Sequence, residues 1–162
     1  MRAVVQRVRR ARVTVDGREV GAIGPGLLAF VGVETGDGPD DVRYIATKIR
    51  DLRIFEDEGD ESGRKRMNRS VVEIGGEVLV VSQFTLVADV SRGRRPSFIR
   101  AAAPDLARAL YEDVVRELRQ SGLTVQTGEF QATMLVSIDN DGPVTIVMDS
   151  PKRADGDSRL TS

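Results

Sequence analysis

The sequence contains no histidine and no cysteine. Without these residues the chain cannot assemble a Ser–His–Asp or Cys–His group for nucleophilic hydrolysis, nor a zinc site of the usual His/Cys kind. It also has no disulfide framework, a composition that fits a reducing compartment such as the cytoplasm. A functional site must therefore be built from hydroxyls, amides, carboxylates, guanidinium groups and the backbone.

Long hydrophobic runs and a strong excess of one charge are missing as well. The longest apolar stretches, such as 26–33, are too short to cross a membrane, and the basic start MRAVVQRVRRARV lacks the apolar core of a signal peptide. Charged residues make up 30% of the chain and nearly balance, with a formal net charge of -1. This balance argues against a general polyanion binder, although a local basic patch remains possible. We expect a cytoplasmic protein without membrane association.

The length of 162 residues suits one domain with a substantial hydrophobic core, which we expect to span residues 1–150. The end of the chain, PKRADGDSRLTS, is small, polar and aperiodic. It predicts a disordered polar tail over residues 151–162. The sequence shows no internal repeat, no GxGxxG and no P-loop.

Alternation of apolar and polar residues predicts that strands dominate the fold. Helical periodicity predicts two helices, one from Asp40 and one opened by Pro104 and followed by Gly122. This order predicts an α+β fold, a mostly antiparallel, curled or barrel-like sheet with two outer helices. The predicted strands are 2–8, 11–15, 18–23, 27–33, 70–74, 77–83, 124–128, 134–140 and 144–149.

Two stretches have the composition of a site. In VVSQFTL, a strand ends abruptly in Ser82, Gln83, Phe84 and Thr85; this is either a strand end turning polar or the lining of a pocket. In NDGPVT, residues 140–145, Pro143 cannot donate to a sheet ladder and Gly142 removes side-chain bulk. This second stretch is either a tight turn or a wall formed by backbone atoms.

A metal site is not expected. Carboxylates could hold Mg²⁺, and five of them lie close together in the sequence. Flanking glycines make a solvated loop the simpler interpretation of this segment. The five are Glu56, Asp57, Glu58, Asp60 and Glu61.

SQFTL and NDGPVT together resemble the signature pair of the D-aminoacyl-tRNA deacylases of the bacterial and eukaryotic type. The resemblance covers roughly residues 1–149. It includes MRAVVQRVRRARVTVDG, GPGLLAFVGVE, the RPSF at 95–98 and TGEF…M…VSIDNDGPVT, all in the family's order.

The resemblance implies a homodimer of small barrel-like subunits with active sites at the interface and without a cofactor. Each site would hydrolyse the ester joining a D-amino acid to the terminal ribose of tRNA. SQFT would line the pocket of one subunit, while Gly142 and Pro143 would enter from the partner, joined by a cis peptide bond, as the chirality filter.

Ester hydrolysis at such a site does not need an imidazole. The backbone N–H groups of Phe84 and Thr85 could stabilise the oxyanion that develops on the ester carbonyl. The Thr85 hydroxyl would lie near that carbonyl, while Ser82 and Gln83 fix the loop and the ribose. Thr85 has no neighbouring base, which disfavours it as a covalent nucleophile; a water activated with help from the substrate's ribose hydroxyl is preferred.

The filter also follows from sterics. If Gly142 and Pro143 present carbonyls to the substrate ammonium, an L side chain is driven into the backbone wall and a D side chain points to open space. Glycine lacks a side chain, so glycyl-tRNA, for example glycine mischarged on tRNA-Ala, should also be a substrate.

Further residues are assigned from the resemblance. Arg7 would support the Gly-Pro carbonyls, and Phe130 and Met134 would contact the 3′ terminal adenosine; Gln131 departs from the small residue usual in the family. A basic run after SQFTL suggests contacts to the tRNA backbone, with a second run, Arg64 to Arg69, as a weaker candidate. The first run contains Arg92, Arg94, Arg95 and Arg100.

Three alternatives stay open. A relative that removes L-alanine through a trans Gly-Pro should deviate in both motifs, whereas Ser82, Phe84, Asp141 and Val144 keep the D-specific pattern. A non-catalytic RNA- or replication-associated binding module would bind without turnover. A purely structural dimer would show only stability effects when Thr85 or Gly142 is replaced.

Overall fold

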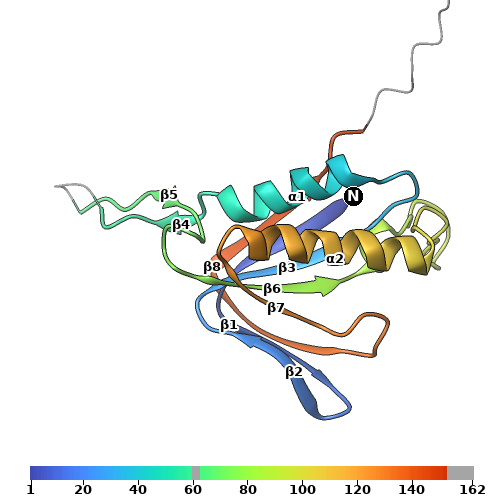
Figure 1. Ribbon diagram of the computed structural model, residues 1–162, viewed down its shortest axis with the longest axis horizontal. Helices are drawn as coiled ribbons and strands as arrows, with labels where there is room; N and C mark the ends of the chain where they lie inside the picture. Colours follow the sequence, from blue (N-terminus) through green and yellow to red (C-terminus); the bar gives the residue numbers. More distant parts are fainter. Residues whose placement is uncertain (60–62, 153–162) are drawn as a thin grey trace, which may run out of the picture.

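The computed structural model describes residues 1–59 and 63–152. Asp60 and Glu61 of the acidic stretch therefore lie outside the described residues, as does the predicted tail from residue 153 onward. The described part forms two helices and a curled sheet, with a small two-stranded sheet projecting from one end (Figure 1).

The main sheet has the strand order β2-β1-β3-β6-β7, and β8 pairs with the other side of β1. Its strands are β1 (Arg2–Val15), β2 (Arg18–Ile23), β3 (Gly26–Gly32), β6 (Glu77–Ser82), β7 (Thr124–Thr127) and β8 (Leu135–Asp149). The small sheet pairs β4 (Phe55–Glu56) with β5 (Met67–Arg69). The helices are α1 (Pro39–Asp51) and α2 (Pro104–Gln120), and a 3-10 turn, η1 (Phe84–Val87), follows β6.

The main sheet is mixed: three of its five strand pairings are antiparallel, in line with the prediction of a mostly antiparallel sheet, and two are parallel, which was not predicted. β1 is antiparallel to β2, β3 and β8, whereas β3–β6 and β6–β7 are parallel. Parallel neighbours need a crossover connection, and here α1 lies between β3 and β6 and α2 between β6 and β7. The predicted α+β fold with two outer helices is confirmed.

The sheet curls until its two ends approach each other. At Gly21 in β2, an added Cβ would lie 2.4 Å from the carbonyl oxygen of Thr127 in β7. Only glycine permits this contact between strands that are not neighbours in the ladder. The sheet is therefore close to a barrel, as expected.

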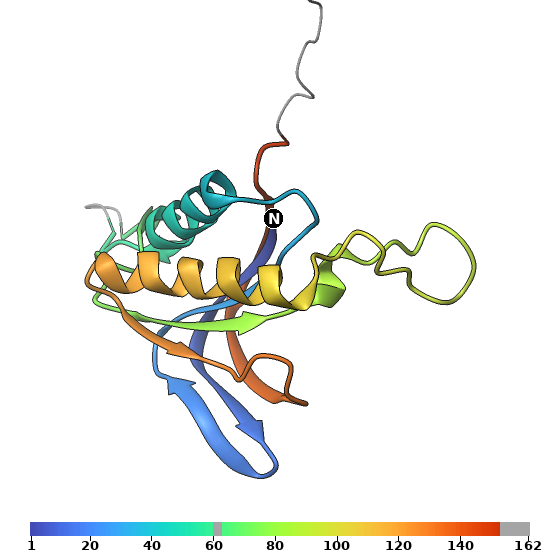
Figure 2. The same ribbon diagram turned by 45° about the vertical axis from the view of Figure 1, so that its right-hand side comes forward.

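Hydrophobic side chains fill both faces of the curl. The larger cluster lies between the sheet and the helices and includes Leu27, Ile45, Ile49 and Leu118. α1 and α2 lie side by side on this face (Figures 1 and 2). The smaller cluster, around Leu28 and Leu79, fills the inside of the curl. Each fully buried leucine or isoleucine contributes about 1.5–3 kcal/mol of transfer free energy.

The segment 70–74 was predicted as a strand and is a turn instead. The amides of Ile74, Gly75 and Gly76 donate to carbonyls three to five residues earlier. Ser70 and Glu73 stabilise the turn, because the Ser70 amide donates to the Glu73 carboxylate at 2.6 Å. The apolar pattern that suggested a strand arises because Val71 is buried under the turn.

Two pairs of predicted strands are single long strands. β1 continues through Arg9 and Arg10, and β8 continues from Leu135 to Asp149. β8 is interrupted by a large bulge: Asn140 pairs with Val8 and Thr145 with Gln6, so residues 141–144 lie opposite Arg7 alone. The NDGPVT stretch therefore protrudes from the sheet.

Within residues 1–59 and 63–152, no helix is both long and apolar enough to span a membrane.

Candidate active site

The SQFT stretch lies where β6 leaves the sheet. Ser82 is the last residue of β6, and the Gln83 amide still donates to the Val31 carbonyl of β3 at 2.8 Å. The chain then turns into η1, closed by the Leu86 amide, which donates to the Gln83 carbonyl at 3.2 Å. Phe84 and Thr85 open η1, and amides at the start of a helix have no partner within it. Their N–H groups are thus available to a ligand.

Gly32 allows this turn to pack on β3. A Cβ at residue 32 would lie 2.9 Å from the Gln83 carbonyl oxygen and 3.1 Å from the Leu86 Cβ. The small residue in the sequence GVE therefore sets the position of the polar strand end.

A cavity of about 560 Å³ adjoins the turn. Its size lies within the range of small-ligand sites. Ser82, Gln83 and Phe84 form one side, and Phe130, Gln131 and Met134 form another. The remaining lining residues are small or apolar: Val33, Val81, Ala101, Ala102, Pro104, Ala107, Ala132 and Val136.

Thr85 is placed differently from the other three residues of SQFT. Its side chain is exposed and does not line the cavity. Its hydroxyl accepts a hydrogen bond from the Gln83 side-chain amide. In this structure Thr85 therefore orients Gln83.

Phe130 lines the cavity and packs against α2. The Arg108 guanidinium lies over its ring at 4.6 Å from the centroid, and the Tyr111 ring packs against it at 6.0 Å. The buried Tyr111 hydroxyl donates to the Val80 carbonyl of β6 at 2.9 Å. Tyr111 thus ties α2, the Phe130 wall and the strand that leads to Ser82.

Gln131 adopts a backbone conformation that is uncommon for a residue with a side chain. Its φ is 64°, in the left-handed region. It lies in the turn where the Ala132 amide donates to the Glu129 carbonyl at 3.2 Å, and its side chain is exposed at the cavity edge.

The Gly142–Pro143 peptide bond is cis, the configuration that the family resemblance implies. Gly142 has a φ of 123°, and a Cβ there would lie 2.8 Å from both Arg7 Nη2 and Val144 Cγ2. Asn140 spans the bulge, because its Nδ2 donates to the carbonyls of Arg7 and Val144, each at 3.0 Å.

Arg7 holds the base of this bulge from within the sheet. It is buried, and its Nε donates to the Asp141 carbonyl at 3.2 Å, while its Nη1 donates to the Ile54 carbonyl at 2.5 Å. The carbonyl it contacts belongs to the residue before Gly142 rather than to Gly142 or Pro143. Arg9 holds the Asp141 carboxylate from the solvent side, at 3.1 Å.

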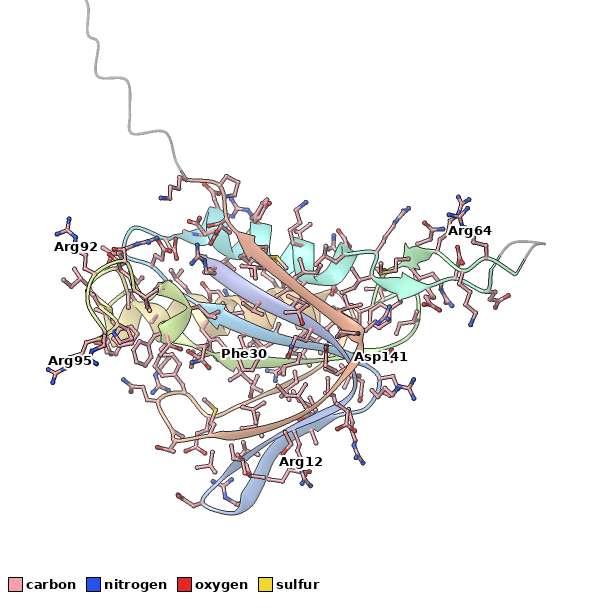
Figure 3. All side chains as sticks on the ribbon, turned by 180° about the vertical axis from the view of Figure 1, so that it is seen from behind. Arg12, Phe30, Arg64, Arg92, Arg95 and Asp141 are labelled. Carbon is pink, nitrogen blue, oxygen red and sulfur yellow. The ribbon has the colours of Figure 1, made fainter. Side chains whose placement is uncertain are left out.

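The Gly-Pro bulge lies far from the cavity of the same chain. Gly142 and Pro143 are exposed and do not line the cavity. Met134 lines the cavity just before β8, and Gly142 comes eight residues later, roughly 25 Å along an extended strand. Figure 3 shows Asp141 at one end of the sheet and Arg92 and Arg95 beyond the other. One chain does not bring the two motifs together.

The basic run after η1 forms a projecting loop (Figure 2). Asp89 and Ser97 close it with two backbone hydrogen bonds of 2.8 and 2.9 Å. Arg92, Arg94 and Arg95 are exposed in the loop, and the labelled Arg92 and Arg95 point outward (Figure 3). Arg100, in contrast, is paired with Glu34 by two contacts of 2.7 and 2.8 Å.

No lining residue of the cavity carries a charged side chain. The nearby Tyr111 hydroxyl keeps its proton, because burial raises the pKa of this group well above its ordinary value. Among residues 1–59 and 63–152, no group of three or more His, Cys, Asp or Glu side chains is arranged to hold a metal ion. The cavity therefore offers hydrogen bonds, backbone amides and apolar surface.

Sequence reasoning missed several residues that shape the site. The three small residues Ala101, Ala102 and Ala107 leave room for the cavity, and the run AAAP before α2 was the only available signal. Tyr111 and Arg108 were read only as part of a helix. Their contacts to Phe130 depend on how α2 packs over the β7–β8 connection.

Comparison with known proteins agrees with this geometry. The profile of the family described as D-Tyr-tRNA(Tyr) deacylase matches residues 4–149. A protein named D-aminoacyl-tRNA deacylase from Heliobacterium modesticaldum is 63% identical over 92% of this chain and 96% of its own length. One of the same name from Syntrophotalea carbinolica is 60% identical over 94% of this chain and 99% of its own.

A solved structure shares the fold over almost the whole described chain. It is the c-Myc DNA unwinding element binding protein, which superposes with a TM-score of 0.84 and is 40% identical over 94% of this chain and 100% of its own. Fold, cavity and relatives together define an enzyme of the hydrolase class. The chain belongs to the D-Tyr-tRNA(Tyr) deacylase family.

Proposed function

We propose that this protein hydrolyses the ester bond of D-aminoacyl-tRNA in the cytoplasm, releasing the free D-amino acid and tRNA. The observation that carries the proposal is the uncharged cavity at the end of β6, where Ser82, Gln83 and Phe84 form one wall. An aminoacyl ester is already labile, so polarisation of its carbonyl is sufficient, and no histidine, thiolate or cofactor is required.

In this mechanism the ester carbonyl lies against the start of η1. The N–H groups of Phe84 and Thr85 stabilise the negative charge that develops on the carbonyl oxygen as water attacks. The bond between the carbonyl carbon and the ribose oxygen then breaks, and the ribose oxygen takes a proton. Gln83, held by Thr85, fixes the ribose together with Ser82, and a neighbouring ribose hydroxyl positions the water.

Chirality is judged by the Gly142–Pro143 unit of a second subunit. Within one chain this unit protrudes from β8 and lies far from the cavity, so a homodimer is required to combine them. The carbonyls of Gly142 and Pro143 hold the substrate ammonium, and the backbone beside them excludes an L side chain. Glycyl-tRNA, which presents no side chain, is accepted, including glycine mischarged on tRNA-Ala.

The terminal adenosine occupies the side of the cavity formed by Phe130 and Met134. The exposed arginines of the projecting loop, Arg92, Arg94 and Arg95, contact phosphates of the tRNA, which positions the substrate without reading its sequence. These contacts make binding dependent on salt concentration.

The direct test compares hydrolysis of D-Tyr-tRNA and L-Tyr-tRNA by the purified protein, with its oligomeric state measured under the same conditions. We expect a dimer that hydrolyses the D-ester and leaves the L-ester intact. A monomer, or equal hydrolysis of both esters, overturns the proposal. If the protein hydrolyses only L-Ala-tRNA, the result favours the activity of the L-alanine-removing relative.

A nucleic-acid-binding role is the second candidate. It is favoured by the similarity to the c-Myc DNA unwinding element binding protein, which this chain matches over nearly its whole described length. Such a module binds nucleic acid without turnover. Binding of tRNA or DNA with no release of the D-amino acid would support it over the deacylase.

A further inference from the structure

A second hollow lies along α2, on the other side of Phe130 from the cavity. It holds about 810 Å³. Phe130 belongs to the walls of both hollows, so they adjoin at its ring. We call the second hollow the α2 groove; its wall comprises Arg108, Tyr111, Glu112, Val115, Arg116, Arg119, Gln120 and residues 127–130.

One face of α2 supplies most of this wall. The helix residues recur at steps of three and four, which places their side chains on the same side of the helix. The other side of the groove is the connection between β7 and β8, which runs beneath α2 (Figures 1 and 2). The groove is thus an open depression between α2 and the β7–β8 connection.

Three guanidinium groups lie in the α2 groove, and each uses only part of its hydrogen-bonding capacity. Arg108 stacks on Phe130, and Arg119 donates one bond to the Val125 carbonyl at 3.1 Å. Arg116 pairs with Asp113 at 2.6 Å. A guanidinium has five N–H donors, so these side chains retain donors for a ligand.

Two carboxylates share the groove with the arginines. Glu129 is paired with Arg18 at 3.4 Å, and Glu112 lies on the helix face between Arg108 and Arg116. This mixture suits an RNA strand, whose phosphates accept from arginine and whose bases carry amino groups. A carboxylate accepts readily from such a group, for example cytosine N4.

We propose that the α2 groove binds the unpaired nucleotides that precede the terminal adenosine of the tRNA substrate. The inference rests on the proposed function, which places that adenosine beside Phe130. A strand whose last nucleoside fills the cavity passes over the Phe130 wall into the groove. There Arg116 and Arg119 contact its phosphates, and Arg108 stacked on Phe130 offers a flat surface for an unstacked base.

The α2 groove and the projecting arginine loop are separate surfaces. The loop extends beyond the N-terminal end of α2 (Figure 2), whereas the groove reaches Gln120 at the C-terminal end of the helix. The cavity lies between them. The groove therefore serves the single-stranded end of the tRNA, and the loop is left for another part of the molecule.

The test uses two substrates and a matched pair of double variants. D-Tyr-tRNA contains the whole 3′ end, and D-tyrosyl adenosine contains only the part that fits the cavity. The groove variant Arg116→Gln/Arg119→Gln is compared with Arg43→Gln/Arg50→Gln, which removes two exposed α1 arginines that also lie beside carboxylates. Circular dichroism checks that both variants are folded.

The measured quantity is the ratio of kcat/KM for D-Tyr-tRNA to that for D-tyrosyl adenosine. We expect the groove variant to lower this ratio about tenfold through KM, because phosphate contacts are lost, and the α1 variant to leave it unchanged. An unchanged ratio in the groove variant, or an equal decrease in the α1 variant, overturns the inference.

A binding measurement separates this inference from the deacylase proposal. Fluorescence anisotropy of a single-stranded RNA ending in CCA requires no turnover. The groove variant should bind more weakly, and the slope of log K against log salt should decrease by about 1.4 for two lost phosphate contacts. If the wild type hydrolyses neither ester, the deacylase proposal fails. Equal RNA binding by the wild type and the groove variant would refute the proposal that the α2 groove binds RNA, whatever the result for hydrolysis.

Discussion

Arg7 and Asp141 are joined at two points. The Arg7 Nε donates to the main-chain carbonyl of Asp141 at 3.2 Å and lies 3.4 Å from its carboxylate. The other end of the guanidinium donates to the Ile54 carbonyl. Because only 7% of Arg7 is exposed, the guanidinium makes these contacts from a buried position. They fix the residue that leads directly into Gly142 and Pro143.

Replacing Arg7 by lysine should loosen the Gly-Pro bulge. A lysine ammonium is a single point of donation and cannot bridge the carbonyls of Ile54 and Asp141 as a guanidinium does. We expect the free energy of unfolding to decrease by about 2 kcal/mol and kcat/KM for D-Tyr-tRNA to decrease by at least about tenfold. Urea denaturation and single-turnover hydrolysis measure the two effects.

Arg9→Lys is the matched control for this prediction. Arg9 contacts the carboxylate of the same Asp141 at 3.1 Å, but its side chain is 80% exposed. Exposed ion pairs contribute about 0–1 kcal/mol, so both stability and turnover should change little. Equal losses in the Arg7 and Arg9 variants would contradict a positioning role for Arg7.

Gly142→Ala should destabilise the protein more than an alanine substitution at another glycine with positive φ. The new Cβ would lie 2.8 Å from Arg7 Nη2 and from Val144 Cγ2. At Gly17 the φ is also positive, at 74°, but nothing lies within 4 Å of an added Cβ. Gly17→Ala therefore measures the conformational cost alone, of about 1 kcal/mol.

We expect Gly142→Ala to cost at least about 1 kcal/mol more than Gly17→Ala in unfolding free energy, and to reduce D-ester hydrolysis strongly. Thermal denaturation and the D-Tyr-tRNA assay measure this. Unchanged hydrolysis in Gly142→Ala would show that the backbone at residue 142 does not take part in the site.

The side chain of Asn140 makes a third prediction possible. Its Nδ2 donates to the carbonyls of Arg7 and Val144, each at 3.0 Å, and so spans the bulge. Asn140→Asp replaces this donor by an acceptor of the same shape, which faces two carbonyl oxygens. We expect a loss of about 2–3 kcal/mol in stability, measured by urea denaturation, together with reduced D-ester turnover.

Asp139→Asn is the control for this prediction, because it exchanges the same two side-chain types, carboxylate and amide, at the neighbouring residue. Asp139 contacts Arg10 on the surface at 2.5 Å, with about half of its side chain exposed, so its replacement should cost less than about 1 kcal/mol. A mild effect of Asn140→Asp, no larger than that of Asp139→Asn, would mean that the bulge keeps its shape without the bridge.

The parts of the fold with local signals were predictable from the sequence. The bounds of β2 follow from alternation beside the Asp16–Gly17 turn, and α2 begins at the proline that opened the predicted helix. Parallel pairing of β6 with β3 and β7 was not predictable, because it depends on which distant strands meet. The turn at 71–75 was predicted as a strand because one buried residue, Val71, produces the alternation of apolar and polar residues that is typical of strands.

In the candidate site, too, features with a local signal were predictable and features that depend on distant parts of the chain were not. Ser82, Gln83 and Phe84 are strand-end residues whose local pattern suggested a pocket, and they do line one. The separation of Gly142 from this cavity depends on the length and bulge of β8, which no local pattern reports. The exposed position of Thr85, bound to Gln83, depends on the tight turn of η1 over Gly32.

Tyr111 predicts how stability depends on pH in the alkaline range. Its hydroxyl donates to the Val80 carbonyl at 2.9 Å. Burial raises the pKa of Tyr111, and the nearby charge of Arg119 opposes this shift only in part. The folded state therefore keeps a proton that the unfolded chain releases above about pH 10. The contribution of Tyr111 to stability is complete below that pH and is lost as the pH rises toward the folded-state value.

We expect the wild type to lose up to about 1.4 kcal/mol of stability per pH unit from this group above about pH 10. Tyr111→Phe should remove that part of the slope and cost about 1 kcal/mol at neutral pH, where one hydrogen bond is lost. The Val80 carbonyl keeps a second donor, the Gly128 amide at 3.1 Å, so no larger penalty arises. Urea denaturation between pH 7 and 11, followed by circular dichroism, measures both effects. A Tyr111→Phe curve parallel to that of the wild type at all pH values would contradict the prediction.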